Sequence, residues 1–202
     1  MPFDAFFLSA AVAELRPQLL GARIDKIQMP VRDQVVFQFR GPGGAGRLLL
    51  SASPGSPRLH LTTAPLQNPA QPPMFCMLLR KHLSGGRITA VTQPPMERLV
   101  DLTLECTDEM GEKAEKHLIV EMMGRGANLV LTSGDGHILD CMRRIDFEMS
   151  DKRQVLPGLL YHLPPVPDKR DPLADSLASI TEALITLEGE KRLEKWLLER
   201  YR

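Results

Sequence analysis

Apolar residues recur at helical spacing at the start of the chain. Phe7, Ala11 and Leu15 would share one helical face, and Asp4 stands where an N-cap residue accepts the first amide hydrogen bonds. Pro17 is expected to shorten or kink the helix. We therefore predict a regular helix over residues 4–16.

From Arg23 onward the period changes to two, which is typical of strands. Short alternating runs are separated by Pro and Gly, and a helix starting at Pro72–Pro73 divides them into two blocks. The predicted strands are 23–30, 34–41, 46–53 and 57–63, then 87–93, 98–106, 116–123, 127–133 and 137–144. The pattern predicts an α+β fold with two packed, mainly antiparallel sheets and flanking helices.

The composition changes near Val155, where a proline-rich stretch begins. We predict a domain over 1–154, a linker over 155–171 and a helical segment over 172–202. The last helix carries an apolar stripe through Leu193 and Trp196, so we expect its partner helices to lie beyond Arg202.

Composition limits the classes of function. Apolar residues make up 43% of the 202 residues, enough for a core, and no run approaches the ~20 apolar residues of a membrane span. With no export signal in view, we expect a cytoplasmic protein without a membrane partner. The zero net charge hides a split, because residues 1–100 hold 11 Lys and Arg against 5 Asp and Glu, and residues 101–202 hold 14 against 20.

Candidate chemistry is sparse. Three cysteines without a Cys-x-x-Cys pair and five scattered histidines predict neither a disulfide framework nor a metal site. The common hydrolase and nucleotide-binding motifs are missing from the sequence, so we expect no cofactor and no enzymatic activity. Pro2 could act as an amine nucleophile, as in formamidopyrimidine-DNA glycosylases, but Phe3 follows where those enzymes carry a carboxylate. We interpret Pro2 as incidental.

Two groups of cations suggest an anionic partner. Cations at a helix C-terminus stabilise it by ~0.3–1 kcal/mol each, but Arg80, Lys81, His82 and Arg87 exceed what capping needs. Arg98 is a charged residue on the apolar face of a strand predicted to start near Glu97. Its partner is either an internal carboxylate such as Asp4 or an external phosphate or base, and the pattern favours neither.

Several stretches together resemble the NFACT N-terminal domain of the RqcH family, the bacterial relatives of NEMF-type ribosome quality-control factors, often labelled fibronectin-binding proteins. They are FDAFFLSAAVAEL at 3–15, GARIDKI at 21–27, LLLSASPGSPRLHLT at 48–62, NPAQPPMFCMLLRKHLSGGRI at 68–88, ERLVDL at 97–102 and VEMMGRGANLVL at 120–131. The resemblance implies a fold similar to the N-terminal domain of formamidopyrimidine-DNA glycosylases. It also implies that residues 172–202 begin a helix-hairpin-helix region.

The resemblance further implies a function. The family binds obstructed large ribosomal subunits carrying peptidyl-tRNA and recruits tRNA, alanyl-tRNA in bacteria, so that the stalled chain receives an untemplated C-terminal tail. The ribosome performs the peptide transfer, which makes the factor an RNA-binding module rather than an enzyme. DNA is not expected as a partner.

Residues implicated in tailing in the family match Asp4 and the pair Glu97 and Arg98, although the usual pair is Asp-Arg. We expect Asp4 and Glu97 to hold Arg98 beside the tRNA anticodon arm, where unpaired bases can be read. We expect RNA backbone contacts from the following cations: Arg58, Arg80, Lys81, Arg87 and Arg125.

Two other functions stay open at this point. A fibronectin-binding surface adhesin is disfavoured by the absence of an export or anchoring signal in the sequence. A DNA glycosylase or lyase rests on fold analogy alone.

Overall fold

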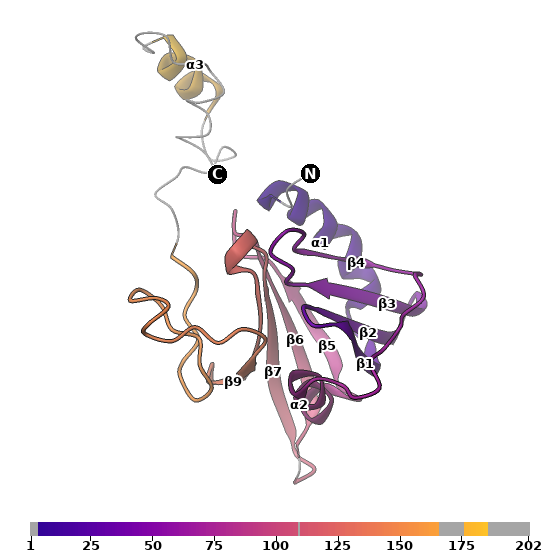
Figure 1. Ribbon diagram of the computed structural model, residues 1–202. Coiled ribbons are helices and arrows are strands. Elements are labelled where there is room, and N and C mark those ends of the chain that lie inside the picture. The colour runs from indigo at the N-terminus through magenta and orange to yellow at the C-terminus, as the bar shows by residue number, and fades with distance from the viewer. Residues whose placement is uncertain (1–3, 109, 166–175, 186–202) are drawn as a thin grey trace. The chain divides into compact units, whose positions relative to one another are not determined.

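The computed structural model describes residues 4–108, 110–165 and 176–185, and divides the chain into two compact units, 1–163 and 164–202. The first unit contains the helices α1 (Ala5–Leu19) and α2 (Met74–Leu83), a short 3-10 helix η1 (Gly124–Gly126), and all the strands (Figure 1). In the second unit, the described residues form helix α3 (Leu177–Ile185).

The strands are β1 (Arg23–Val31), β2 (Gln34–Gly41), β3 (Gly44–Ser51), β4 (Arg58–Leu61), β5 (Arg87–Thr92), β6 (Leu99–Thr107), β7 (Lys113–Glu121), β8 (Asn128–Ser133) and β9 (Ile138–Cys141). They form one sheet in the order β4-β3-β2-β1-β5-β6-β7-β8-β9, and every neighbouring pair is antiparallel. The predicted α+β class and the nine predicted strands are confirmed.

The prediction of two packed sheets is corrected to one continuous sheet, because β1 and β5 join the two blocks. The Ile24 amide donates to the Gly86 carbonyl and the Ile88 amide to the Ala22 carbonyl, both at 2.9 Å. One hydrophobic core serves both halves of the sheet and includes Phe37 on β2 and Leu102 on β6. The likeness to formamidopyrimidine-DNA glycosylases stays a prediction.

Helix α1 runs three residues further than predicted and contains Pro17. A proline in the last turn removes one hydrogen-bond donor, a loss that packing can offset. Leu15 and Leu19 are buried in the core on either side of Pro17, and they hold the last turn in helical form.

The first part of the predicted linker belongs to the first unit. The Val155 amide donates to the Ile145 carbonyl and the Gly158 amide to the Ile138 carbonyl, each at 2.8 Å. Val155 lies in a second apolar cluster with residues of β6 to β9, among them Leu99 and Ile138. The domain boundaries themselves stay predictions, and residues 166–175 and 186–202 lie outside the described part of the chain.

The long strands β6 and β7 run from one end of the sheet to the opposite end. Leu99 pairs with Glu121 where β6 begins, and Thr107 pairs with Lys113 where it ends, about 27 Å away at ~3.4 Å per residue. The start of α1 and η1 lie at the first end, and the C-terminus of α2 and the β6–β7 turn at the second (Figure 1). We call them the Arg98 end and the Lys113 end. None of the helices in the described ranges is long and apolar enough to cross a membrane.

Candidate functional site

A glutamine after β5 connects the start of α1 to the loop that precedes β6. The Gln93 side-chain amide donates to the Ala5 carbonyl at 3.0 Å and to the Glu97 carbonyl at 2.8 Å. The segments that carry Asp4, Glu97 and Arg98 therefore lie together at the Arg98 end. Sequence reasoning did not find Gln93, since a polar residue after a strand has no distinctive pattern.

Asp4 is the N-cap of α1, as predicted. Its carboxylate accepts a hydrogen bond from the Phe7 amide at 2.8 Å, and the residue is exposed. Among the described residues, no salt bridge joins Asp4 to Arg98. The expectation that Asp4 and Glu97 hold Arg98 stays a prediction.

Arg98 precedes β6 instead of lying within it. Its carbonyl accepts a hydrogen bond from the Met122 amide at 2.8 Å, and its side chain is exposed. The preceding turn is closed by the Glu97 amide and the Pro94 carbonyl at 3.1 Å, with Met96 at a φ of 56°. A non-glycine residue in this conformation costs ~1–3 kcal/mol, so the surrounding contacts hold the Glu97–Arg98 loop in a strained shape.

Arg125 lies in η1, three residues after Met122, and is exposed. It is therefore at the Arg98 end, whereas α2 carries Arg80 and Lys81 near the Lys113 end (Figure 1). The cations that sequence reasoning grouped as one backbone-binding set occupy at least two places.

Three of those cations are held by backbone carbonyls. Arg80 Nε donates to the Ile27 carbonyl at 2.8 Å, Arg58 Nη1 to that of Ser56 at 2.8 Å, and Arg87 Nη1 to that of Gly21 at 2.9 Å. A carbonyl orients a guanidinium without neutralising it, so each arginine keeps its positive charge.

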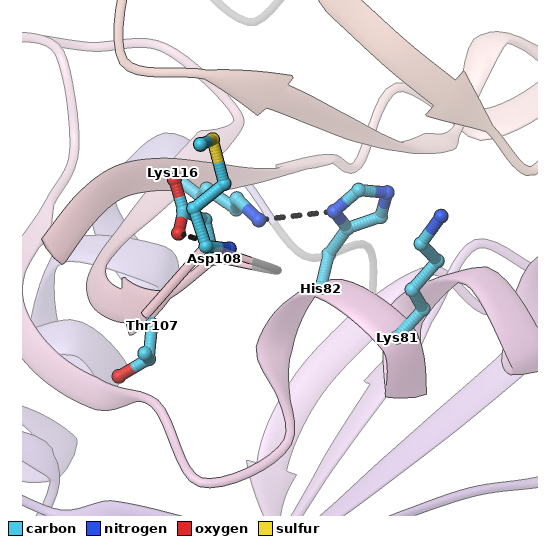
Figure 2. Close-up of a pocket in the computed structure, with 6 residues that line it drawn as sticks. Lys81, His82, Thr107, Asp108 and Lys116 are labelled. Carbon is cyan, nitrogen blue, oxygen red and sulfur yellow. Dashed lines mark hydrogen bonds between the residues drawn. The ribbon is translucent and has the colours of Figure 1, made fainter. Parts of the chain in front are cut away.

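A pocket of about 550 Å³ lies where the C-terminus of α2 meets β7. Figure 2 shows Lys81 and His82 rising side by side from α2, with Lys116 reaching His82 from the strand. Lys116 is only 8% exposed, and its Nζ lies 2.9 Å from His82 Nδ1. An ammonium can only donate, so Nδ1 of His82 is the acceptor in this pair and its ring proton is on Nε2.

A histidine and a carboxylate pair on β6 and β7 resembles half of a catalytic triad. Asp101 Oδ2 lies 2.9 Å from His117 Nδ1, and the Thr103 hydroxyl approaches the same nitrogen at 3.4 Å. A triad uses both ring nitrogens, one for the carboxylate and one for the nucleophile, so Thr103 does not complete one. Burial raises the pKa of Asp101, and the neighbouring His117 counteracts this rise.

The buried thiols are poor candidates for chemistry. Burial raises the pKa of Cys76, of Cys106 and of Cys141, the last to about 12. Within the described part of the chain, no cluster of His, Cys, Asp and Glu could hold a metal ion.

The geometry of this domain recurs in solved proteins. The N-terminal part of the fibronectin/fibrinogen-binding protein from Streptococcus suis superimposes with a TM-score of 0.88 at 33% identity, covering 99% of this chain and 74% of that one. The N-terminal domain of the fibronectin-binding protein PavA from Streptococcus pneumoniae gives 0.84 at 37% identity, covering 92% and 70%. The fold therefore defines the class of domain found at the start of these proteins.

Sequence comparison identifies the family more specifically than the structural comparison does. The family described as NFACT N-terminal and middle domains matches residues 4–202. The Rqc2 homolog RqcH of Bacillus subtilis (strain 168) is 39% identical over 202 residues, 100% of this chain and 35% of that protein. The ribosome quality control complex subunit NEMF of Homo sapiens is 30% identical over 141 residues, 70% of this chain and 12% of that protein.

The chain belongs to the NFACT family, which includes the RqcH and NEMF ribosome quality-control factors. The predicted resemblance is confirmed. The chain spans about a third of the length of the RqcH relatives it matches.

Proposed function

We propose that the chain is the RNA-binding module of a ribosome quality-control factor. The factor binds large subunits obstructed by peptidyl-tRNA and recruits tRNA, alanyl-tRNA in bacteria, for untemplated tailing of the stalled chain. It acts in the cytoplasm, and the ribosome performs the chemistry. The observation that supports this proposal is the Gln93 junction, which joins the start of α1 to the loop before β6, the two segments that carry Asp4, Glu97 and Arg98.

The Arg98 end has the groups that recognition of unpaired bases needs. The exposed guanidinium of Arg98 can stack on a base or form two hydrogen bonds with it, and Arg125 lies at the same end. Phe6 and Phe7 in the first turn of α1 are 41% and 48% exposed and add aromatic surface for stacking. An anticodon loop presents single-stranded bases of this kind.

The test compares RNA captured from lysate by the wild-type chain, by Arg98→Ala and by a control, Arg144→Ala. Arg144 is also largely exposed, with 67% of its side chain accessible, but follows β9. We expect wild type and Arg144→Ala to enrich tRNA and Arg98→Ala to lose about 5- to 150-fold in affinity, the equivalent of ~1–3 kcal/mol for one specific contact. Equal capture by all three proteins would contradict the role of Arg98.

Asp4 has two roles that substitutions can separate. Asp4→Asn keeps a capping oxygen and removes the charge, while Asp4→Ala removes both and costs ~1 kcal/mol of stability. We expect both variants to lose tRNA binding and only Asp4→Ala to be less stable in urea unfolding. If Asp4→Asn binds as wild type does, Asp4 is only a helix cap.

A second candidate is fibronectin binding, since the two solved relatives described above carry that name. Immobilised fibronectin would then retain the wild-type chain at physiological salt, with Arg98→Ala retained equally. No retention would exclude this candidate.

A further inference from the structure

Three arginines lie next to one another across three neighbouring strands. In the strand register, Arg23 on β1 is directly opposite Arg40 on β2 and also directly opposite Arg87 on β5. Residues directly opposite each other point to the same face of a sheet, and neighbouring strands lie about 4.8 Å apart. All three residues are exposed. We call this set the arginine row.

Like charges in opposite positions destabilise strand pairing, and the protein compensates for them only in part. Arg87 Nη1 bonds the Gly21 carbonyl, and Arg40 Nη2 lies 3.5 Å from Asp25 Oδ2 in an exposed pair. The side chain of Arg23, in the middle, has no hydrogen bond or salt bridge to any described residue. The centre of the row therefore has an unneutralised guanidinium between two others.

The guanidinium of Arg23 lies beside Gly85. A Cβ built on Gly85 would lie 3.4 Å from Arg23 Nη2, so the guanidinium rests against the turn between α2 and β5. A side chain at position 85 would occupy the space beside it. The absence of one leaves that space open.

A small pocket lies at this point. It has a volume of about 130 Å³, and its charged lining residues are Arg23, Arg87, Lys113 and Glu105. Lys113 Nζ contacts Glu105 Oε1 at 2.9 Å, so the single carboxylate is already paired with one of the three cations. The remaining positive charge and the small volume suit a tetrahedral oxyanion. Thr107 lines both this pocket and the pocket of Figure 2, so the two are neighbours at the Lys113 end.

We propose that the arginine row binds consecutive phosphates of one RNA strand that crosses β2, β1 and β5, with one phosphate in the pocket beside Gly85. This inference rests on the proposed RNA-binding function and adds Arg23, Arg40 and Lys113 to its contacts. Arginines on neighbouring strands, which lie about 4.8 Å apart, can each take a different phosphate of an RNA strand lying across them. Consecutive phosphates are therefore the ligand that fits both the row and the pocket.

The test uses the double variant Arg23→Gln/Arg40→Gln and a matched control, Arg32→Gln/Arg144→Gln. The control also removes two positive charges from exposed positions. Arg32 and Arg144 line a different pocket, next to the C-terminal end of β1. We expect the row variant to bind tRNA at least tenfold more weakly than the control at low salt. Its plot of log affinity against log salt should be shallower by about 1.4, or ~0.7 per lost phosphate contact. Urea unfolding should show no loss of stability, because the row variant removes like-charge repulsion.

A second measurement separates failure of the row from failure of RNA binding. Inorganic tripolyphosphate is titrated into the wild-type chain while the Nε–Hε NMR signals of Arg23, Arg40 and Arg87 are followed. Shifts of these signals ahead of the other arginines support the row, even if the chain binds no tRNA and the proposed function fails. Equal tRNA binding by the two double variants overturns the assignment to RNA, and unshifted signals overturn the row as a phosphate site.

Discussion

At the scale of single residues, a buried carboxylate fastens the end of the first unit to the sheet. Glu121 is fully buried on β7 and accepts hydrogen bonds from Arg153 at 3.2 and 2.5 Å and from the Tyr161 hydroxyl at 2.8 Å. The Arg153 guanidinium also lies 5.1 Å from the centre of the Tyr161 ring. Burial, followed by the Glu121 charge, raises the pKa of Tyr161. The three side chains form one interdependent group.

Removing the cation from this group should be costly. Arg153→Ala leaves the Glu121 carboxylate buried without its charge partner, and we expect the free energy of unfolding to fall by ~3–5 kcal/mol in urea. Arg40→Ala removes an arginine from an exposed ion pair with Asp25 and should change stability by less than ~1 kcal/mol. Similar losses for both variants would show that the buried group contributes no more to the free energy of unfolding than an exposed ion pair does.

Asp135 is a titration probe of a surface turn. The Ser133 hydroxyl, which donates at 2.5 Å, and then His137 hold the pKa of Asp135 at about 2. A depressed carboxyl pKa stabilises the fold above the ordinary value near 3.8 and this contribution is lost as the pH falls toward 2. We expect Ser133→Ala to move the midpoint of the Asp135 carboxyl ¹³C shift upward toward 3.8. An unchanged midpoint, as expected for Ser84→Ala on the α2 cap, would contradict the assigned cause.

At the scale of elements, Gly86 is the joint between the two halves of the sheet. Its carbonyl accepts from Ile24, and a Cβ at this position would lie 2.8 Å from Cys106 Sγ and 3.0 Å from the Leu83 carbonyl. We expect Gly86→Ala to lower the free energy of unfolding by ~1–3 kcal/mol through overpacking. Gly43→Ala is the control, because a Cβ there meets nothing within 4 Å. Equal stability of the two variants in urea would show that the structure around Gly86 accommodates a methyl group without loss of stability.

Local patterns predicted the elements well and their association less well. The period of two placed all nine strands to within about two residues of most observed limits, which is the ordinary uncertainty of strand and helix ends. The continuous sheet was missed because the pairing of Ile24 with Gly86 joins segments 62 positions apart, and no local pattern encodes it. Pro17 was overweighted, since burial of Leu19 offsets one lost hydrogen bond.

Some residues of the candidate site could likewise be predicted from the sequence, and others could not. The charged misfit at Arg98 was visible in the alternation, and the family resemblance supplied Asp4 and Glu97. Gln93 was invisible because its role depends on two distant carbonyls. The arginine row was equally invisible, since a shift of one residue in the register would move Arg23 to the opposite face of the sheet.

At the scale of the whole molecule, the fold brings together cations from both halves of the sequence. The sequence divides into a basic and an acidic half, yet Lys113 and Lys116 from the acidic half line pockets at the Lys113 end with Arg23 and Lys81 from the basic half. Arg98 and Arg125 lie at the other end of β6, about 27 Å away. Substitutions at the two ends are far enough apart for their effects on RNA affinity to add.

The residue at which the first unit ends decides which chain can be used as an isolated domain. Val155 is fully buried and Tyr161 bonds Glu121, so a chain ending at Gln154 lacks groups that the structure packs into the first unit. We expect a chain of residues 1–163 to unfold in urea as the longer chain does, and a chain of residues 1–154 to lose ~3 kcal/mol or more with the burial of two large side chains. Equal stability of the two truncated chains would place the boundary at 154, as the proline-rich composition predicts, and would make residues 155–163 a linker that packs without stabilising.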